Sequence, residues 1–223
     1  MRGCYLAQPS PAGEGYSVLE FKRRLQRNLN LRPLPTGEGW GEGRSTKVLL
    51  MLELILGGAR SGKSRLAEKL AADSGLEVTY IATGQAWDGE MAKRIAHHRA
   101  ARPAVWGLVE EPLELARALR DNAAPQRCLL VDCLTLWLTN LLMLEDDARL
   151  AMQRDAFLEV FSEVRGRIIL VSNETGLGVA PLGELTRRYV DEAGWLHQAV
   201  AERAERVQFC VAGLPTLLKG EPL

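Results

Sequence analysis

Residues 52–64, with the sequence Leu52-Glu53-Leu54-Ile55-Leu56-Gly57-Gly58-Ala59-Arg60-Ser61-Gly62-Lys63-Ser64, decide the fold of this chain. An apolar run typical of a buried strand leads into a G-x4-G-K-S pattern, and a helical sequence follows. Glycines let such a loop curl so that its N–H groups point at phosphates, and the positive end of the next helix strengthens the attraction. Strand, loop and helix signals agree, which disfavours a glycine-rich turn with an incidental Lys-Ser pair. The segment therefore predicts nucleotide binding.

Two side chains of this loop have expected chemical roles. Lys63 should reach the β- and γ-phosphates of a nucleotide, and Ser64 should ligate Mg²⁺. Asp132 is the expected second Mg²⁺ ligand, because the apolar run before it places its carboxylate at the carboxyl end of a buried strand. The alternative role for Asp132 is to cap a helix that starts near Leu134. Nucleotide contacts are expected from the whole loop, namely Gly57, Gly58, Ala59, Arg60, Ser61, Gly62, Lys63 and Ser64.

Apolar runs alternate with helical stretches from Met51 onward, which predicts a parallel sheet covered on both faces. The expected fold class is α/β, a P-loop NTPase-like (RecA-like) mostly parallel sheet with helices on both faces and a ligand site beyond the carboxyl ends of the strands. Strands are expected at Leu52–Leu56, Glu77–Ala82, Val105–Val109, Cys128–Asp132, Ile168–Ser172 and Val207–Ala212. Helices are expected at Lys63–Ala72, Gly89–Ala101, Leu113–Arg120, Leu134–Leu144, Ala148–Arg165 and Leu182–Arg206, the last interrupted at Gly194.

Composition and charge exclude several kinds of partner. The chain has 223 residues, 47% of them hydrophobic, and its 28 Lys and Arg side chains balance 28 Asp and Glu side chains. A net charge of zero gives no general attraction to nucleic acid or to an anionic membrane, so neither is an expected partner. The longest candidate for a membrane span, near Lys47–Leu56, is broken by Glu53.

The four cysteines, Cys4, Cys128, Cys133 and Cys210, show no C-x-x-C spacing, and three of them lie in apolar strand-like runs. Such cysteines are expected to be reduced and mostly buried. Together with the lack of a visible secretory signal, they predict a cytoplasmic protein.

Residues 1–50 differ from the rest of the chain. They contain four prolines, a run of alternating glycines at 37–43 and little apolar periodicity. Such a segment has no visible means of building a core. We therefore expect a poorly ordered and dispensable extension at 1–50, with Met51 as a candidate true start, and a nucleotide-binding domain at 51–223. A basic targeting segment is the alternative, although acidic residues and glycine repeats do not suit one.

Two of the three histidines in the chain, His97 and His98, are adjacent. Neighbours on a helix point about 100° apart, so at most one of the two can face a nucleotide squarely. From the pattern alone, two surface or hydrogen-bonded histidines are the favoured interpretation. Spacing by itself makes neither histidine catalytic.

A resemblance to a known family changes that interpretation. Six segments occur in the family's order, and together they resemble the bifunctional adenosylcobinamide kinase/adenosylcobinamide-phosphate guanylyltransferase family of cobalamin biosynthesis. The resemblance covers Met51–Lys219 and leaves residues 1–50 unmatched. The segments are GGARSGKS at 57–64, YIAT at 80–83, RIAHHR at 94–99, DCLT at 132–135 with TNLL at 139–142, SNETGLG at 172–178, and GLP at 213–215 with Lys219.

The resemblance implies two reactions at or near one site. In the first, ATP or GTP phosphorylates the aminopropanol hydroxyl of adenosylcobinamide, a corrinoid; in the second, GMP passes from GTP to that phosphate. The family's first histidine carries the GMP, which implies His97 as the nucleophile, and Lys63 is implied as the second catalytic residue. A neutral imidazole can attack the α-phosphorus, and the resulting phosphoramidate can pass GMP to a phosphate acceptor. Lys63, backbone N–H groups and Mg²⁺ would offset the charge on the phosphoryl oxygens.

The resemblance also implies further nucleotide contacts and a homo-oligomer, a trimer whose contacts bury apolar helix faces such as that of Leu134–Leu144. Glu110 resembles a guanine- or ribose-contacting acid, or it is a surface carboxylate beside Glu111. Asn173-Glu174 follows a buried strand, where it either touches a ligand or forms a tight turn. The implied contacts are Ile81, Ala82, Thr83, His98, Arg99, Ala100, Ala101, Glu110 and Asp132.

The chain departs from some relatives in the family at His197-Gln198, where an Asn-Gln pair is common, so the role of that helix stays open. Two other functions also stay open. A plain small-molecule kinase would use the phosphate loop with a structural His97, and a regulatory NTPase would need only the loop and Asp132. Neither alternative requires the histidine pair.

Overall fold

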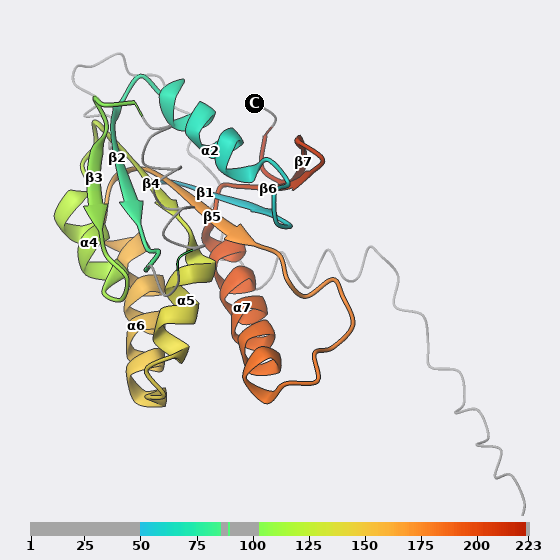
Figure 1. Ribbon diagram of the computed structural model, residues 1–223. Helices are drawn as coiled ribbons and strands as arrows, with labels where there is room; N and C mark the ends of the chain where they lie inside the picture. Colours follow the sequence, from blue (N-terminus) through green and yellow to red (C-terminus); the bar gives the residue numbers. More distant parts are fainter. Residues whose placement is uncertain (1–49, 86–88, 90–102, 222–223) are drawn as a thin grey trace, which may run out of the picture. The chain divides into compact units, whose positions relative to one another are not determined.

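The structure is a computed structural model that describes residues 50–85, 89 and 103–221, all within the compact unit Thr46–Leu223. Figure 1 shows the arrangement of its elements. The strands are β1 Leu50–Gly57, β2 Glu77–Ala82, β3 Gly107–Glu110, β4 Arg127–Asp132, β5 Gly166–Asn173, β6 Arg206–Val211 and β7 Leu214–Lys219. The helices are α2 Lys63–Ala72, α4 Leu115–Asn122, α5 Leu134–Leu142, α6 Asp147–Glu159, a 3-10 turn at Val160–Ser162, and α7 Glu184–Arg203.

All seven strands form one sheet in the order β3-β2-β4-β5-β1-β6-β7. Every neighbouring pair is parallel except β6 and β7, which form an antiparallel hairpin at one edge. The predicted α/β fold with a mostly parallel sheet is therefore confirmed. Strand β5 lies between β1, which leads into the phosphate loop, and β4, which ends at Asp132. The two strand ends expected to act together are thus one strand apart.

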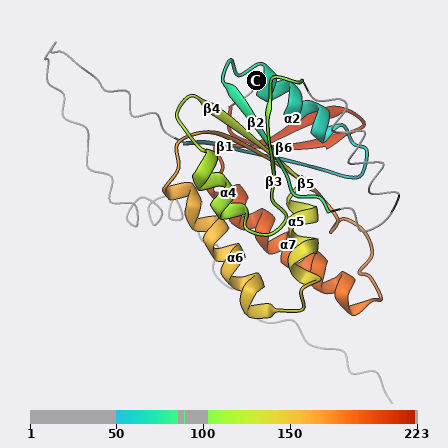
Figure 2. The ribbon, with the colours of Figure 1, turned by 60° about the vertical axis from the view of Figure 1, so that its left-hand side comes forward.

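Helices cover both faces of the sheet (Figure 2). Helix α2 packs on one face, where Ile55, Ala67 and Val171 belong to one buried cluster. Helices α4, α5, α6 and α7 cover the other face, whose larger core includes Leu54 and Leu170. Side chains alternate between the two faces along a strand, so one buried strand serves both cores. This arrangement explains why the central strands read as continuous apolar runs.

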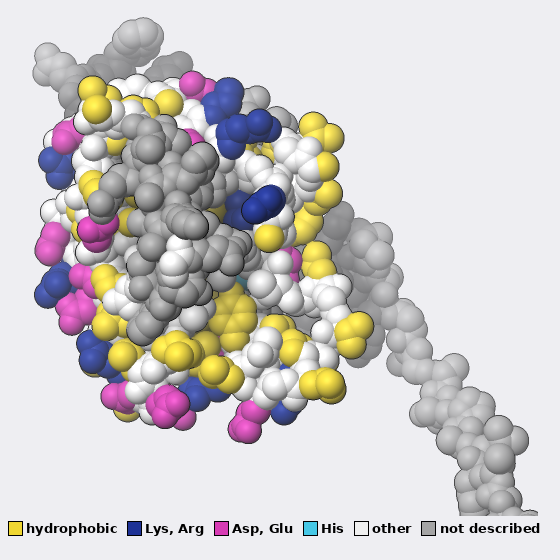
Figure 3. All heavy atoms as spheres, in the orientation of Figure 1, with side chains coloured by type: hydrophobic (Ala, Val, Ile, Leu, Met, Phe, Trp, Pro, Cys, Tyr) yellow, Lys and Arg dark blue, Asp and Glu magenta, His cyan; other side chains and the backbone are white. Residues whose placement is uncertain are grey.

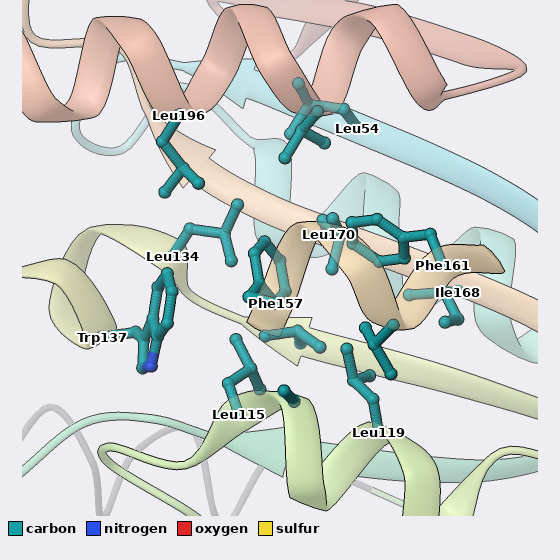
Figure 4. Close-up of a cluster of buried hydrophobic side chains, with 14 of the residues drawn as sticks. Leu54, Leu115, Leu119, Leu134, Trp137, Phe157, Phe161, Ile168, Leu170 and Leu196 are labelled. Atoms are coloured by element: carbon teal, nitrogen blue, oxygen red, sulfur yellow. The ribbon is translucent and has the colours of Figure 1, made fainter. Parts of the chain in front are cut away.

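An aromatic group fills the centre of the larger core (Figure 4). The ring centroids of Trp137 and Phe157 are 4.9 Å apart, and those of Phe157 and Phe161 are 5.0 Å apart in an edge-to-face arrangement. The indole N–H of Trp137 donates to the carbonyl of Leu113 at 2.8 Å, so this buried polar group is satisfied. Trp137 is therefore a core residue, whereas Trp195 is exposed.

The apolar face of helix α5 packs inside the chain. Leu134, Trp137, Leu138 and Leu141 recur at helical spacing and are fully buried within the chain. The expectation that Leu134–Leu144 buries its apolar face against another subunit is therefore wrong for this face. Met143 and Leu144, at the end of the segment, are exposed and remain available for a contact with another subunit.

Helix α7 runs without a break through Gly194, contrary to the expected interruption. A glycine inside a helix costs only about 1 kcal/mol relative to alanine. Packing of Ala193, Leu196 and Val200 in the core offsets a cost of that size. The periodic burial of the helix therefore overrides the local preference of one residue.

Strand β7 is not among the predicted strands. All of its residues are exposed, and it contains Pro215, which is tolerated on an edge strand. Ala212 and Gly213 connect it to β6 with φ values of 52° and 81°. Two positive φ values in a two-residue loop are typical of a type I′ hairpin turn.

No helix in the described ranges is both long and apolar enough to cross a lipid bilayer. Figure 3 shows basic and acidic side chains interspersed over one face of the molecule, in keeping with the zero net charge.

Candidate active site

The phosphate loop lies between the carboxyl end of β1 and the first turn of α2. The Lys63 ammonium folds over the loop and donates to the Gly58 carbonyl at 3.1 Å, and the Ser61 N–H donates to the same carbonyl at 3.3 Å. Lys63 is 8% exposed, so its charge is concentrated inside the loop rather than spread over the surface. A phosphate group arriving there would meet the ammonium and the start of helix α2 together.

Two loop glycines have no room for a side chain. A Cβ at Gly57 would lie 2.5 Å from the Ser61 Oγ and 2.6 Å from the Cys210 carbonyl oxygen. A Cβ at Gly62 would lie 2.9 Å from the Gly213 Cα, and Gly62 has a φ of 97°. These positions therefore need glycine for close backbone packing as well as for conformation.

Hydrogen bonds from the rest of the sheet brace the loop near both ends. The Glu174 N–H, just beyond β5, donates to the Gly57 carbonyl at 3.0 Å. The Gly213 N–H, in the β6–β7 turn, donates to the Ser61 carbonyl at 2.8 Å. The predicted Asn173-Glu174 segment therefore contacts the loop through its backbone.

Asp132 lies at the carboxyl end of β4, as predicted, and is half-buried. Its Oδ2 accepts a hydrogen bond from the Tyr80 hydroxyl at 3.1 Å. It does not cap helix α5, because Cys133 is the N-cap residue and no side chain caps that helix. The capping alternative is therefore wrong, and the carboxylate remains available as a metal ligand.

The oxygen donors at this edge fit Mg²⁺. The Ser64 hydroxyl lies in the first turn of α2, and the Asp132 carboxylate lies at the end of β4. Mg²⁺ prefers oxygen ligands and usually keeps waters and substrate phosphates around one or two protein groups. No cluster of three or more His, Cys, Asp or Glu residues suited to a metal occurs in the part of the chain that the structure describes.

Thr83 joins the ends of β2 and β4. Its Oγ1 donates to the Cys133 carbonyl at 2.7 Å and accepts the Cys133 N–H at 2.9 Å, while the Asn140 side chain donates to the Thr83 carbonyl at 2.8 Å. Ile81 lies in the core with no exposed surface. The side chains of Ile81 and Thr83 therefore support this edge of the sheet from the protein interior. Ala82 lies between them in the sequence and is half-buried.

The neighbouring acids Glu110 and Glu111 differ in environment. Glu111 accepts the Leu113 and Glu114 backbone N–H groups at 3.0 and 2.8 Å, so it shapes the turn before α4. Glu110 is exposed and pairs in register with Ala82 at the carboxyl edge of the sheet. Position therefore favours Glu110 over Glu111 as the acid that meets a ligand.

The other predicted nucleotide contacts lie outside the described residues. They are His97, His98, Arg99, Ala100 and Ala101, in the expected helix Gly89–Ala101, of which only Gly89 is described. The described chain leaves β2 at its carboxyl end and resumes before the amino end of the parallel strand β3, so only the first flank of this segment lies at the carboxyl edge.

The three cysteines in the described residues, Cys128, Cys133 and Cys210, are buried, as predicted. Burial raises the pKa of Cys133 to about 11, against a smaller opposing effect of the Lys63 charge. Burial likewise raises the pKa of Cys128 to about 11 and that of Cys210 above its usual value. Thiols with raised pKa values are poor nucleophiles at neutral pH.

One polar group at this edge is absent from the predicted site. The His197 Nε2 lies 2.8 Å from the Ser172 Oγ, and its Nδ1 lies 3.7 Å from the Glu174 Oε2. Burial lowers the pKa of His197 from its usual 6.5, and the Glu174 carboxylate opposes this shift. The only sequence signal for this group was the departure from the family at His197-Gln198.

Comparisons with known proteins identify a matching family and several similar proteins. Residues 53–218 match the family model described as cobinamide kinase / cobinamide phosphate guanyltransferase. The chain is 73% identical over 173 residues to the bifunctional adenosylcobalamin biosynthesis protein CobP of Pseudomonas aeruginosa, which covers 78% of this chain and 100% of that protein. It is 37% identical over 182 residues to the bifunctional adenosylcobalamin biosynthesis protein CobU of Escherichia coli, covering 76% and 100%. A RadB recombinase structure matches 71% of this chain and 73% of its own, at 16% identity and a TM-score of 0.39.

Proposed function

The chain belongs to the cobinamide kinase / cobinamide phosphate guanyltransferase family, and we propose that its phosphate loop serves both reactions of this bifunctional enzyme of cobalamin biosynthesis. The enzyme phosphorylates adenosylcobinamide and transfers GMP from GTP to the resulting phosphate. One observation carries the proposal: the braced loop Gly57–Ser64 holds Lys63 at the sheet edge where β4 presents Asp132. That edge provides the positive charge and the carboxylate that phosphoryl chemistry needs.

In the kinase step, the corrinoid hydroxyl oxygen attacks the γ-phosphorus of ATP or GTP, and the nucleoside diphosphate leaves. Lys63 and the loop N–H groups bind the transferred phosphoryl group and offset its developing charge. Ser64 and Asp132 hold Mg²⁺, which when bound neutralises phosphate charge and orients the phosphates. The oxygen donors described at this edge support that assignment.

In the guanylyl step, a ring nitrogen of His97 attacks the α-phosphorus of GTP and releases pyrophosphate. An oxygen of adenosylcobinamide phosphate then attacks the phosphorus of the GMP-histidine, which frees His97 and gives adenosylcobinamide-GDP. Support comes from family membership and from the start of the segment, which follows β2 at the carboxyl edge of the sheet. His98 and Arg99 serve as neighbours in the nucleotide site, and Glu110 contacts the guanine or ribose.

Backbone groups complete the proposed nucleotide site. The residues Gly57, Gly58, Ala59, Arg60, Ser61 and Gly62 surround the phosphates, while the segments 81–83 and 100–101 border the nucleoside. The burial of Ile81 and Thr83 supports a role through the backbone rather than the side chains.

We also assign to the protein a cytoplasmic location, a homo-oligomeric state that is trimeric, and a dispensable extension at 1–50. The whole CobP relative is covered over 173 residues, which supports a functional core without that extension. Exposed apolar side chains at Leu177, Val179 and Leu182, before α7, are a better candidate for a subunit contact than helix α5. Light scattering at micromolar concentration tests the trimer, and deletion of residues 1–50 tests whether the extension is dispensable.

Product analysis tests the proposed function. Purified protein is incubated with adenosylcobinamide, ATP, GTP and Mg²⁺, and the corrinoid is followed by mass spectrometry. We expect adenosylcobinamide phosphate first and adenosylcobinamide-GDP afterwards. Accumulation of the phosphate alone would instead support a plain kinase, and nucleotide hydrolysis with unchanged corrinoid would support a regulatory NTPase.

A further inference from the structure

A group of polar residues in mutual contact links helices α5 and α7 to the end of strand β5. The Ser172 Oγ is within 2.8 Å of the His197 Nε2, and it lies 3.4 Å from the Thr135 Oγ1. That threonine oxygen in turn accepts the Asn173 N–H at 2.8 Å. Three elements that are far apart in the sequence therefore meet at the two residues that end β5.

This strand end has a special place in the sheet. Asn173 pairs in register with Gly57, the first residue of the phosphate loop, and Val171 pairs with Asp132 on the other side. The Glu174 N–H then donates to the Gly57 carbonyl. The segment Ser172–Glu174 thus lies between the loop that binds phosphates and the carboxylate proposed to hold Mg²⁺. A shift of this segment would move both partners relative to each other.

His197 connects this group of hydrogen-bonded side chains to helix α7. Its imidazole ring lies on the side of α7 that packs against the core. His197 is 7% exposed, and Ser172 is 1% exposed. Because burial lowers the pKa of His197, the ring is neutral at neutral pH and has one donor and one acceptor nitrogen. One of them serves Ser172. The charged group facing the other nitrogen is the Glu174 carboxylate.

We propose that His197 is a positioning residue for both transfer reactions, acting through Ser172 to hold the segment Ser172–Glu174 against the phosphate loop. The proposal rests on the function proposed above. His197 does not touch the phosphates. It sets where the Glu174 N–H meets the Gly57 carbonyl, and therefore how the loop and Asp132 face each other.

Filling the same space with an apolar side chain would not replace this role. A leucine at position 197 would remove the hydrogen bond at 2.8 Å and leave Ser172 with only the longer contact to Thr135. A buried hydroxyl that loses a partner costs free energy, so the strand end would shift to find another one. Misplacement of reacting groups by about 1 Å can cost on the order of 100-fold in rate. A glutamine could still donate to Ser172, because its amide nitrogen reaches about as far from the backbone as the histidine Nε2.

The test compares His197→Leu, His197→Gln and Ser172→Ala with the wild type in both reactions. Gln198→Leu is the matched control, because Gln198 is exposed on the same helix and its amide bonds only the Gly194 carbonyl in the described structure. We expect His197→Leu and Ser172→Ala to lower kcat in both reactions by roughly 10- to 100-fold, with KM for the nucleotide changed less than about 3-fold. His197→Gln and Gln198→Leu should stay within about 3-fold of the wild-type kcat.

The outcomes separate positioning from simple packing. Thermal unfolding of each variant is measured alongside, and if His197→Leu fails to fold, the smaller change Ser172→Ala decides the question. Wild-type kcat in a folded His197→Leu or Ser172→Ala protein would overturn the proposal. So would His197→Gln as slow as His197→Leu, because the hydrogen bond would then not matter. A wild-type protein without either activity would instead refute the proposed function.

Discussion

The N–H of Gly213 donates to the carbonyl of Ser61 at 2.8 Å, so the turn of the terminal hairpin is joined to the phosphate loop. The contact is close, because a Cβ on Gly62 would meet the Gly213 Cα at 2.9 Å. A hairpin at the edge of the sheet therefore helps to fix the conformation of the loop that binds nucleotide.

Replacing Gly213 should weaken this brace. Its backbone φ of 81° is disfavoured for residues other than glycine. A Cβ at this position would lie 3.2 Å from an Arg65 guanidinium nitrogen. We expect Gly213→Ala to lower the free energy of unfolding by about 1 kcal/mol and to weaken GTP binding. Gly213→Asn should be milder, because asparagine tolerates the left-handed region better. Urea denaturation and GTP titration measure both effects, and unchanged GTP affinity in a destabilised Gly213→Ala protein would show that the brace does not serve the loop.

Removing the Lys63 ammonium should abolish both activities. Each reaction needs a triphosphate in the same loop, and Lys63 is the cation placed inside it. We expect Lys63→Ala to lower kcat/KM by more than about 100-fold in both assays while the far-ultraviolet circular dichroism stays unchanged. Lys69→Ala is the control, since that exposed lysine on the same helix pairs only with Asp73 among the described residues. Retention of either activity in Lys63→Ala would place that reaction elsewhere.

Glu53 should be a stability residue remote from the chemistry. It is fully buried in β1, and its carboxylate contacts Arg167 at 2.6 Å and Arg206 at 3.2 Å. Removing one member leaves buried charges uncompensated, so we expect Glu53→Ala to lower the free energy of unfolding by about 3–5 kcal/mol. Glu77→Ala, which breaks the exposed pair with Arg127, should cost less than about 1 kcal/mol. Similar losses in urea denaturation for the two variants would contradict this assignment.

Stability should fall in mild acid through His197. Burial lowers its pKa in the folded protein below the usual 6.5, so the unfolded chain binds the proton more readily. The stabilisation is complete above about pH 6.5 and is lost as the pH falls through the folded-state pKa. The melting temperature of the wild type should therefore drop more between pH 8 and pH 5 than that of His197→Gln. An equal drop in melting temperature for the two proteins would show that another group causes the loss of stability in acid.

The sequence predicted the parts of the fold that depend on periodicity. The strand Glu77–Ala82 and the helix Lys63–Ala72 have the predicted bounds, because burial on a parallel sheet leaves a clear apolar pattern. The exposed strand β7 leaves no such pattern, so it was missed. The helix break predicted at Gly194 was wrong because tertiary packing outweighs one residue's preference.

The predicted site divides in the same way. Motif spacing placed Lys63 in the loop and Asp132 at a strand end, since both positions follow from local sequence. The contact between His197 and Ser172 joins residues 25 positions apart on different elements, and no local pattern encodes it. The assignment of His97 stays a prediction, because this residue lies outside the described ranges.

Covalent labelling at His97 is the most direct measurement of the proposed mechanism. Wild type, His97→Ala and His98→Ala are incubated with GTP labelled at the α-phosphate and with Mg²⁺, then separated by denaturing electrophoresis. We predict an acid-labile, base-stable adduct on wild type and His98→Ala and none on His97→Ala, because a neighbour about 100° away on a helix cannot take over the in-line attack. GTP binding to His97→Ala should persist through Gly57–Ser64. Label on His97→Ala, or no label on the wild type, would contradict the GMP-histidine mechanism and favour a plain kinase.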